Sequence, residues 1–323
     1  MSIPKEALDG VKTIVSHVGC PDGTVSALLL SDVLPEAEVK MIGHAELEGL
    51  PVTPGMLFCD IAPTADRAQE FVDAGAIVLD HHAGTEKVVR AFGDRGRYAD
   101  AETEPGVSGA VLAYEEVWAP HFLSDSVDFS TRWAEDSWAD RVKRLAILTG
   151  IRDTWVDTHS EWRAACIQHQ VLTFGPQERW LKLGLPDALV EIARLDWLGQ
   201  IRVEQGEESV AKVINGGSQK SVTSRGAILR VFPGAHVASG VAGAADDTDL
   251  CIGFTFGFDQ HGGFMNCALR SEGKYDCLAL ATMFGGGGHK NAAGFRFRVK
   301  GRDMHPFGLI PSLVDGFEKR GAQ

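Results

Sequence analysis

The sequence predicts an α/β protein: an N-terminal doubly wound parallel sheet, a helical connector and a smaller C-terminal α/β domain with a mixed sheet. Three observations support this prediction. Short apolar runs alternate with helical segments in the first half, a charged helical stretch follows, and strand-like alternation dominates after residue 210. We therefore expect domains over 1–180 and 210–323, with residues 181–209 as a helical linker.

The first domain shows the alternation of strands and helices that is typical of a parallel sheet. Four short apolar runs are expected to be strands: 11–17, 38–43, 56–60 and 76–80. Four segments with helical spacing are expected to be helices: 23–34, 63–75, 108–120 and 142–150. The second of these starts at Pro-Thr and closes on Gly75, which is the punctuation expected of a helix.

The second domain is expected to contain a mixed sheet. Four segments have the alternation of strands: 227–233, 251–258, 264–271 and 294–300. A helix is expected over 275–285, between the last two strands.

Composition places the chain among soluble globular proteins. Its 323 residues are 44% hydrophobic and 23% charged. No apolar run approaches the roughly 20 residues of a membrane span, and the N-terminus has no leader signature, so a cytoplasmic protein without membrane contact is expected. Six cysteines without CxxC spacing indicate reduced thiols, and they indicate neither a disulfide framework nor a zinc finger.

The charge is strongly acidic but unevenly distributed. A net charge of −13 argues against duplex DNA as a partner, because duplex binding requires a basic face. Residues 265–300 carry a local charge of +4, which leaves −17 on the remainder. This pattern suggests an anionic ligand held by the basic segment and cations held by the acidic part. A solvated basic face is the alternative interpretation.

Polar side chains follow several of the predicted strands at their carboxyl ends. His17 closes the first strand with Asp22 just beyond, and Asp60 closes the third. The fourth ends in Asp80, followed by His81 and His82, and Asp153 lies just past a later apolar run. Ligands of open parallel sheets bind beyond the carboxyl ends of the strands, so these side chains are expected to converge.

A cluster of carboxylates of this kind repels itself unless cations lie among them. Oxygen-rich sites with one or two imidazoles suit Mn²⁺, Mg²⁺ or Fe²⁺, and this many ligands favours two ions that share a bridging carboxylate. Each of these residues taken singly is also common in turns and helix caps. The prediction of a metal site therefore depends on several of them occurring at the same sheet edge.

The order of these segments resembles the DHH phosphoesterase family. The matching segments are SHVGCPDG at 16–23, Asp60, Asp80-His81-His82, GIRDT at 150–154, Leu269-Arg270-Ser271 and GGGGHKNAAGF at 285–295. They occur in the family's order and cover nearly the whole chain. The resemblance extends to compact members with the DHH-associated C-terminal domain, of the nanoRNase and pAp phosphatase kind.

The resemblance implies roles for these residues. Two divalent ions, Mn²⁺ above all, would be bridged by Asp60. The remaining metal ligands would be Asp22, His81 and Asp153 at one ion and His17 at the other. His82 would contact the scissile phosphate and Asp80 would orient a histidine, so the catalytic set is Asp80, His82 and Arg270.

The same resemblance assigns the second domain to substrate binding. Arg270, the backbone of Gly286, Gly287 and Gly288, and His289 would grip a terminal phosphate, and Ser108 joins this substrate-binding set. Glycine backbone approaches anions closely and guanidinium binds phosphate bidentately, which supports this assignment independently. A flexible glycine turn is the alternative.

One residue departs from the family pattern. The first motif of the family usually has two aspartates, whereas Cys20 stands near the place of the first. Cys20 is expected to be a metal ligand in a variant site; the alternatives are a spectator role and a site at which one metal is held more weakly. A cysteine-based phosphatase is disfavoured because no arginine follows Cys20 closely, and a nicotinamide dehydrogenase is disfavoured because GxGxxG is missing after the first strand.

The expected function is metal-dependent hydrolysis of phosphodiester bonds in short single-stranded RNA or DNA oligonucleotides and dinucleotides, by two-metal activation of water. The nucleotide pAp is a further candidate substrate. The alternatives are a soluble cyclic-dinucleotide phosphodiesterase, a single-strand-specific exonuclease and a non-catalytic nucleotide-binding module. The sequence leaves the oligomeric state open, a homodimer included.

Overall fold

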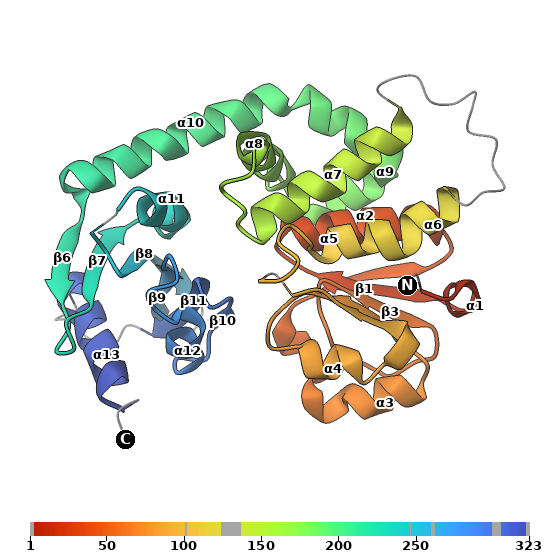
Figure 1. Ribbon diagram of the computed structural model, residues 1–323, viewed down its shortest axis with the longest axis horizontal. Coiled ribbons are helices and arrows are strands. Elements are labelled where there is room, and N and C mark those ends of the chain that lie inside the picture. The colour runs from red at the N-terminus through yellow and green to blue at the C-terminus, as the bar shows by residue number, and fades with distance from the viewer. Residues whose placement is uncertain are drawn as a thin grey trace. The chain divides into compact units, whose positions relative to one another are not determined.

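The computed structural model describes residues 3–100, 102–123, 137–245, 247–259, 262–298 and 305–320 (Figure 1). It divides into two compact units, Met1–Val203 and Glu204–Gln323. The division falls inside helix α10 (Asp196–Lys212), within the stretch 181–209 that was expected to link two domains. In the described residues, no helix is both long and apolar enough to cross a membrane.

The first unit contains a five-stranded parallel sheet. Its strands are β1 (Thr13–His17), β2 (Glu38–Ile42), β3 (Met56–Cys59), β4 (Ile77–Asp80) and β5 (Gly96–Tyr98), in the order β2-β1-β3-β4-β5. The four strands expected from the sequence are confirmed. β5 was not expected, because Gly-Arg-Tyr offers no apolar run.

Helices cover both faces of this sheet, as the doubly wound prediction requires (Figure 1). The helices of the unit are α1 (Lys5–Leu8), α2 (Pro21–Val33), α3 (Ala68–Asp73), α4 (Glu86–Arg90), α5 (Gly109–Ala113), α6 (Ala119–Phe122), α7 (Trp138–Asp153), α8 (Trp162–Leu172) and α9 (Gln177–Arg194). Short 3₁₀ turns lie at η1 (His44–Glu46), η2 (Ala65–Arg67) and η3 (Gly93–Arg95). Alternate strand residues separate into two cores: Leu57 packs with α2, α5 and α7, whereas Phe58 packs with α3 and α4.

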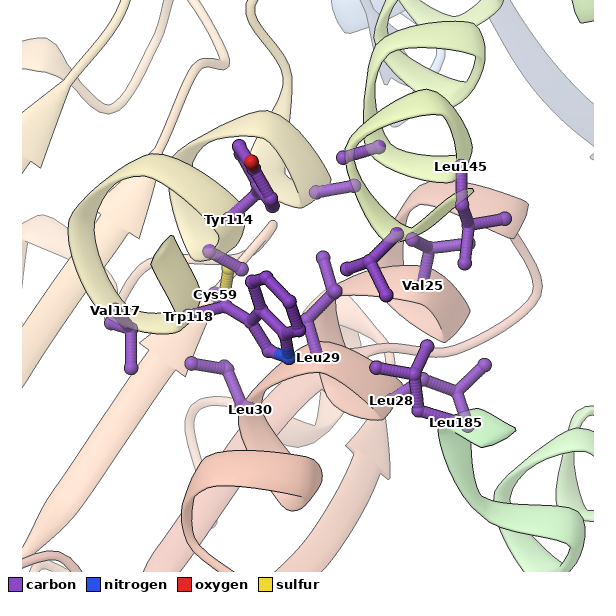
Figure 2. Packing of buried hydrophobic residues seen from close by; sticks show 14 of the residues in the cluster. Val25, Leu28, Leu29, Leu30, Cys59, Tyr114, Val117, Trp118, Leu145 and Leu185 are labelled. Carbon is purple, nitrogen blue, oxygen red and sulfur yellow. The ribbon is translucent and has the colours of Figure 1, made fainter. Parts of the chain in front are cut away.

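The helix expected over 108–120 contains a π-helical turn, η4 (Tyr114–Trp118), between α5 and α6. The indole of Trp118 is fully buried beside Leu29 of α2 (Figure 2). Its Nε1 donates a hydrogen bond to Asp32 Oδ2 at 2.9 Å. Trp118 thus contributes both apolar packing and a satisfied polar group to the larger core.

Leu29→Ala is expected to lower the free energy of unfolding of the first unit by about 2–5 kcal/mol, because Leu29 is fully buried and its loss leaves a cavity. All seven tryptophans precede residue 204, so tryptophan fluorescence during urea unfolding follows this unit alone. Val190→Ala in α9 is the control: Val190 is 64% exposed, and its change should stay within about 0.5 kcal/mol. Equal effects of the two substitutions would contradict the packing described.

The connector region is helical, as expected. α9 bends at Gly184, which has a φ of 71° and precedes Leu185-Pro186. The proline lacks the N–H that an unbroken helix would need at this position, so the chain turns there. α10 then continues into η6 (Val213–Gly217).

The second unit contains a six-stranded mixed sheet in the order β10-β11-β9-β8-β7-β6. Its strands are β6 (Gln219–Val222), β7 (Ile228–Pro233), β8 (Leu250–Asp259), β9 (Gly262–Arg270), β10 (Gly287–Gly288) and β11 (Ala292–Arg298). Its helices are α11 (Ala238–Gly243), α12 (Cys277–Thr282) and α13 (Pro306–Arg320), with the 3₁₀ turn η7 (Ala235–Val237). β7 and β8 are parallel and the other pairs are antiparallel. The mixed sheet is confirmed; residues 299–300 of the last expected strand lie outside the described residues.

Candidate metal centre

The carboxyl edge of the first sheet gathers the predicted metal ligands from different elements. His17 is the last residue of β1, Asp60 follows β3 directly and His81 follows β4. Asp22 lies in the first turn of α2, and Asp153 is the last residue of α7. Ligand atoms lie within 4.8 Å of one another in three groups: a first of His17, Cys20 and Asp60, a second of Asp22, His81 and Asp153, and a third of Asp60, Asp80, His81 and His82.

Asp60 belongs to the first group and also contacts His81 of the second, because its two carboxylate oxygens face different neighbours. Its Oδ2 is 3.1 Å from Cys20 Sγ and 3.7 Å from His17 Nδ1. Its Oδ1 is 3.2 Å from His81 Nε2. The same His81 nitrogen lies 3.6 Å from Asp22 Oδ2 and 3.4 Å from Asp153 Oδ2. The two oxygens of Asp60 therefore face different donors, Cys20 and His17 on one side and His81 on the other.

The backbone of Asp60 is held in an unusual conformation. Its φ is 61°, in the left-handed region that non-glycine residues adopt rarely but aspartate and asparagine tolerate best. Its N–H donates to the carbonyl of Leu79 in β4 at 3.0 Å. The turn at the end of β3 is therefore fixed by the neighbouring strand, which directs the carboxylate into the cluster.

Asp22 is oriented by the start of α5. Its carboxylate accepts hydrogen bonds from Ser108 Oγ at 2.5 Å and from the N–H groups of Gly109 and Ala110 at 2.8 and 2.9 Å. The partial positive charge of the α5 N-terminus favours this carboxylate. Ser108 was expected to bind substrate, but it is fully buried and its hydroxyl binds Asp22. We propose that Ser108 positions Asp22 instead.

Burial and mutual repulsion govern the charges of the cluster. Burial, and then the charge of Asp22, raise the pKa of Asp60 well above its ordinary value, and the same two causes raise the pKa of Asp153. Burial, with His44 and His82 nearby, lowers the pKa of His17 to about 4. A neutral imidazole and crowded carboxylates make a donor set that divalent cations fit, because a cation removes the repulsion.

Asp80 and His82 form a separate pair beside the ligands. His82 Nδ1 donates to Asp80 Oδ1 at 2.7 Å, and the same oxygen accepts the N–H of His81 at 2.9 Å. Burial opposes ionisation of Asp80, but the charge and hydrogen bond of His82 outweigh it and hold the pKa of Asp80 at about 2. Burial likewise opposes the charge on His82, and Asp80 raises its pKa to about 9. Asp80 Oδ1 thus contacts both histidines of the doublet, whereas its buried Oδ2 has no hydrogen-bond partner among the described residues.

Cys20 is part of the first group. It is the N-cap of α2, where its Sγ accepts the N–H of Gly23 at 3.2 Å, and it lies 3.5 Å from His17 Nδ1. Burial and the charge of Asp60 raise the pKa of its thiol. A cation bound here would displace the thiol proton, as thiolate ligands require.

Cys20→Ala is expected to weaken the binding of one of two divalent ions by at least about tenfold, because one donor of the first group is lost. Cys20→Asp should retain both ions but move the preference from softer Zn²⁺ towards Mn²⁺, since carboxylate oxygen is a harder donor than sulfur. Metal titration followed by elemental analysis measures both effects. A spectator thiol would leave affinity and preference unchanged in both variants.

Two residues at the centre were missed from the sequence. His44 follows β2 at the same sheet edge, and its ring centroid lies 5.0 Å from that of His17 and 6.2 Å from that of His82. Its place after a strand end is the signal that could have found it. Gln177, the first residue of α9, accepts from Gly19 N at 2.6 Å and donates to Cys20 O at 3.0 Å. No sequence signal marks Gln177, because its contacts are about 160 residues away along the chain.

The second unit places its predicted substrate-binding residues at one end of its sheet. Arg270, the last residue of β9, is paired with Ala292 of β11, and His289 N donates to Ala292 O at 2.7 Å. Arg270 Nε donates to Ser239 Oγ at 2.7 Å. The structure therefore brings Arg270 and the glycine turn together.

The glycines of this turn differ in how much space surrounds the position of a Cβ atom. A Cβ on Gly286 would lie 2.1 Å from Gly294 O, and one on Gly288 would lie 2.5 Å from Ala292 O. Both must be glycine for the β10–β11 hairpin to pack. Gly287 is exposed and has nothing within 4 Å of a Cβ position. Close packing thus accounts for two of the three predicted glycines, and Gly287 is the one whose surroundings are open to a ligand.

No family model and no curated protein match this chain. The chain is similar to the solved DHH domain of a protein described as a member of a ribosomal-protein family, with a TM-score of 0.55 and 14% identity over 98% of this chain and 87% of that one. It is also similar to a pGpG-specific phosphodiesterase from Vibrio cholerae, with a TM-score of 0.42 and 14% identity over 95% and 99% of the two chains. An exopolyphosphatase-related protein from Bacteroides fragilis has a TM-score of 0.44 and 12% identity over 98% and 97%. The first of these likenesses shows that this chain has the fold of that DHH-domain structure.

Proposed function

We propose that this chain is a metal-dependent phosphoesterase of the DHH type, which hydrolyses short single-stranded oligonucleotides and dinucleotides to mononucleotides. The observation that carries the proposal is the position of Asp60, whose two oxygens face two separate donor groups at 3.1 and 3.2 Å. A carboxylate shared in this way is the hallmark of paired cations that act on phosphate esters. The fold of the DHH-domain structure supports the same proposal.

The donor chemistry indicates which residues hold the ions. His17, Cys20 and Asp60 would hold one, and Asp22, Asp60, His81 and Asp153 the other. Such ions supply an activated water nucleophile and neutralise charge on a phosphoryl group. Mn²⁺ is our proposed occupant, because oxygen and imidazole donors predominate.

The protein's own groups then orient the substrate. The Asp80–His82 hydrogen bond fixes the ring of His82 through Nδ1, and we propose that this oriented imidazole contacts a phosphoryl oxygen. The Ser108, Gly109 and Ala110 donors hold the Asp22 carboxylate in a single orientation. Pre-set groups of this kind cost no reorganisation when charge develops on the phosphate.

The second unit would bind the nucleotide through Arg270, Gly287 and His289. Other basic residues of this segment are engaged elsewhere: Arg298 pairs with Asp259 at 2.6 Å and Lys274 lies 3.9 Å from Asp249. Arg270 contacts Ser239 Oγ and the carbonyl of Leu269 at the end of β9 beside the glycine turn, and we propose that it binds a phosphate from this position. A cationic patch this small suits a short oligonucleotide better than a long polymer, which would need an extended basic track.

The test uses purified protein with Mn²⁺ and defined substrates: RNAs of two to five nucleotides, pAp, cyclic dinucleotides and longer single-stranded DNA. We expect mononucleotide release to be fastest from the shortest RNAs and to depend on Asp153, with Asp157→Asn, an exposed change in the following loop, as the matched control for Asp153→Asn. If the protein instead prefers cyclic dinucleotides or long single-stranded DNA, that class would replace short oligonucleotides as the proposed substrate. Inactivity on every phosphodiester with Mn²⁺, Mg²⁺ and Fe²⁺ would leave a nucleotide-binding module.

A further inference from the structure

A narrow pocket opens behind the second metal group, on the side of α7 and α8. Its lining includes Asp22 and Asp153, together with Thr149, Arg152, Gln168 and His169. The ligands Asp22 and Asp153 thus belong both to the candidate metal centre and to this pocket. None of the motifs singled out from the sequence assigns a role to Arg152 or His169.

The guanidinium of Arg152 is held by aromatic rings. Its Cζ lies 4.3 Å from the ring centroid of Trp155 and 5.4 Å from that of Trp162, and those two rings are 4.9 Å apart. Its polar contact is with the Cys166 thiol. Within the described parts of the chain, no carboxylate lies at ion-pair distance from it. Stacking fixes the position of the cation, and the charge of the neighbouring Asp153 acts on it from beyond ion-pair distance.

The backbone beside this cation is strained. Trp155 has a φ of 60°, which is rare for an aromatic residue and costs of order 1 kcal/mol or more. The strained residue lies two positions after Asp153 and turns its ring onto Arg152. Strained residues cluster at ligand sites, where surrounding structure maintains them.

Charge balance indicates what this cation would bind. The carboxylates of the metal centre, together with a Cys20 thiolate, would offset the charge of two divalent ions. A substrate phosphate beyond the one attacked has no balancing charge in that centre. The guanidinium of Arg152, at the edge of the metal centre, would supply this positive charge. Its forked N–H donors also match the spacing of phosphate oxygens.

We propose that Arg152 and His169 form an anion subsite that binds a second, non-scissile phosphate of the substrate. The imidazole of His169 lines the pocket beside Arg152 and adds one hydrogen-bond donor. This subsite would select dinucleotides that carry a terminal phosphate. The assignment of that substrate rests on the proposed function.

The test compares two substrates that differ by one phosphate, pApA and ApA, in wild-type and Arg152→Gln protein. For pApA we expect Arg152→Gln to raise KM about 10- to 100-fold with little change in kcat, the effect of losing charge-assisted hydrogen bonds. For ApA, KM should change by less than about twofold, because no phosphate occupies the subsite. The control is Arg163→Gln, which removes the same charge from an exposed position of α8. It should leave both substrates unaffected.

Calorimetry with inorganic phosphate provides a readout that needs no turnover. Phosphate binding to the metal-loaded protein should weaken at least about tenfold in Arg152→Gln and remain unchanged in Arg163→Gln. If the wild type hydrolyses nothing but shows this dependence, the proposed function fails and the subsite stands. Equal loss for pApA and ApA, or loss of metal from Arg152→Gln, would overturn the subsite, because Arg152 would then support the Asp153 ligand.

Discussion

Replacing Asp60 by asparagine is expected to lower hydrolysis by at least about a thousandfold, since a bridged metal pair supplies several kcal/mol of transition-state stabilisation. Asparagine has the same size and tolerates the left-handed conformation that Asp60 adopts, at a φ of 61°. The substitution therefore removes the bridging charge and leaves the turn intact. Activity on the preferred substrate and the number of bound ions, by elemental analysis, are the measurements.

The stability of the metal-free protein separates a lost bridge from a lost fold. Asp60→Asn also removes a carboxyl crowded by Asp22, so its free energy of unfolding should stay within about 1 kcal/mol of the wild type. Asp66→Asn, an exposed change six residues further on, is the matched control and should retain full activity. An Asp60→Asn variant that binds two ions and turns over normally would contradict the assignment.

Gly109→Ala should damage the centre without replacing any proposed ligand. An added Cβ would lie 2.6 Å from Asp60 Cβ, 2.8 Å from Asp22 Oδ2 and 2.9 Å from Asp60 Cα. Atoms at and beside the backbone cannot withdraw, so Asp60 and Asp22 must move. Overpacking of this kind costs about 1–3 kcal/mol, and a ligand shift near 1 Å lowers activity about a hundredfold. Thermal unfolding and kcat measure the two effects.

Gly84→Ala is the control for this substitution. Gly84 follows the histidine doublet closely, is exposed, and has nothing within 4 Å of its Cβ position. The same chemical change there should alter neither stability nor turnover measurably. If Gly109→Ala were equally silent, the contact between the α5 N-terminus and the two aspartates would not have the rigidity described.

Strand-end residues of the first sheet could be placed from the sequence because parallel strands deliver their carboxyl ends to a single edge. Apolar runs such as 56–60 fixed those ends to within one residue of the observed strands. β5 escaped prediction because its pairing with β4 comes from tertiary context and not from any apolar pattern of its own.

Long-range contacts to the centre could not be derived in the same way. Gln177 reaches the loop after β1 from the start of α9, and Ser108 proved to be a partner of Asp22. Both contacts depend on how helices pack on the sheet, which periodicity does not specify. The glycine run likewise suggested phosphate binding, whereas Gly286 and Gly288 are already required by hairpin packing.

Anomalous diffraction from crystals containing Mn²⁺ tests most directly whether two divalent ions share Asp60. We predict two anomalous peaks about 3.5–4 Å apart, one beside His17 and Cys20, the other beside Asp22, His81 and Asp153, with one Asp60 oxygen on each. A single peak, or two peaks of which Asp60 contacts only one, would contradict the sharing of Asp60.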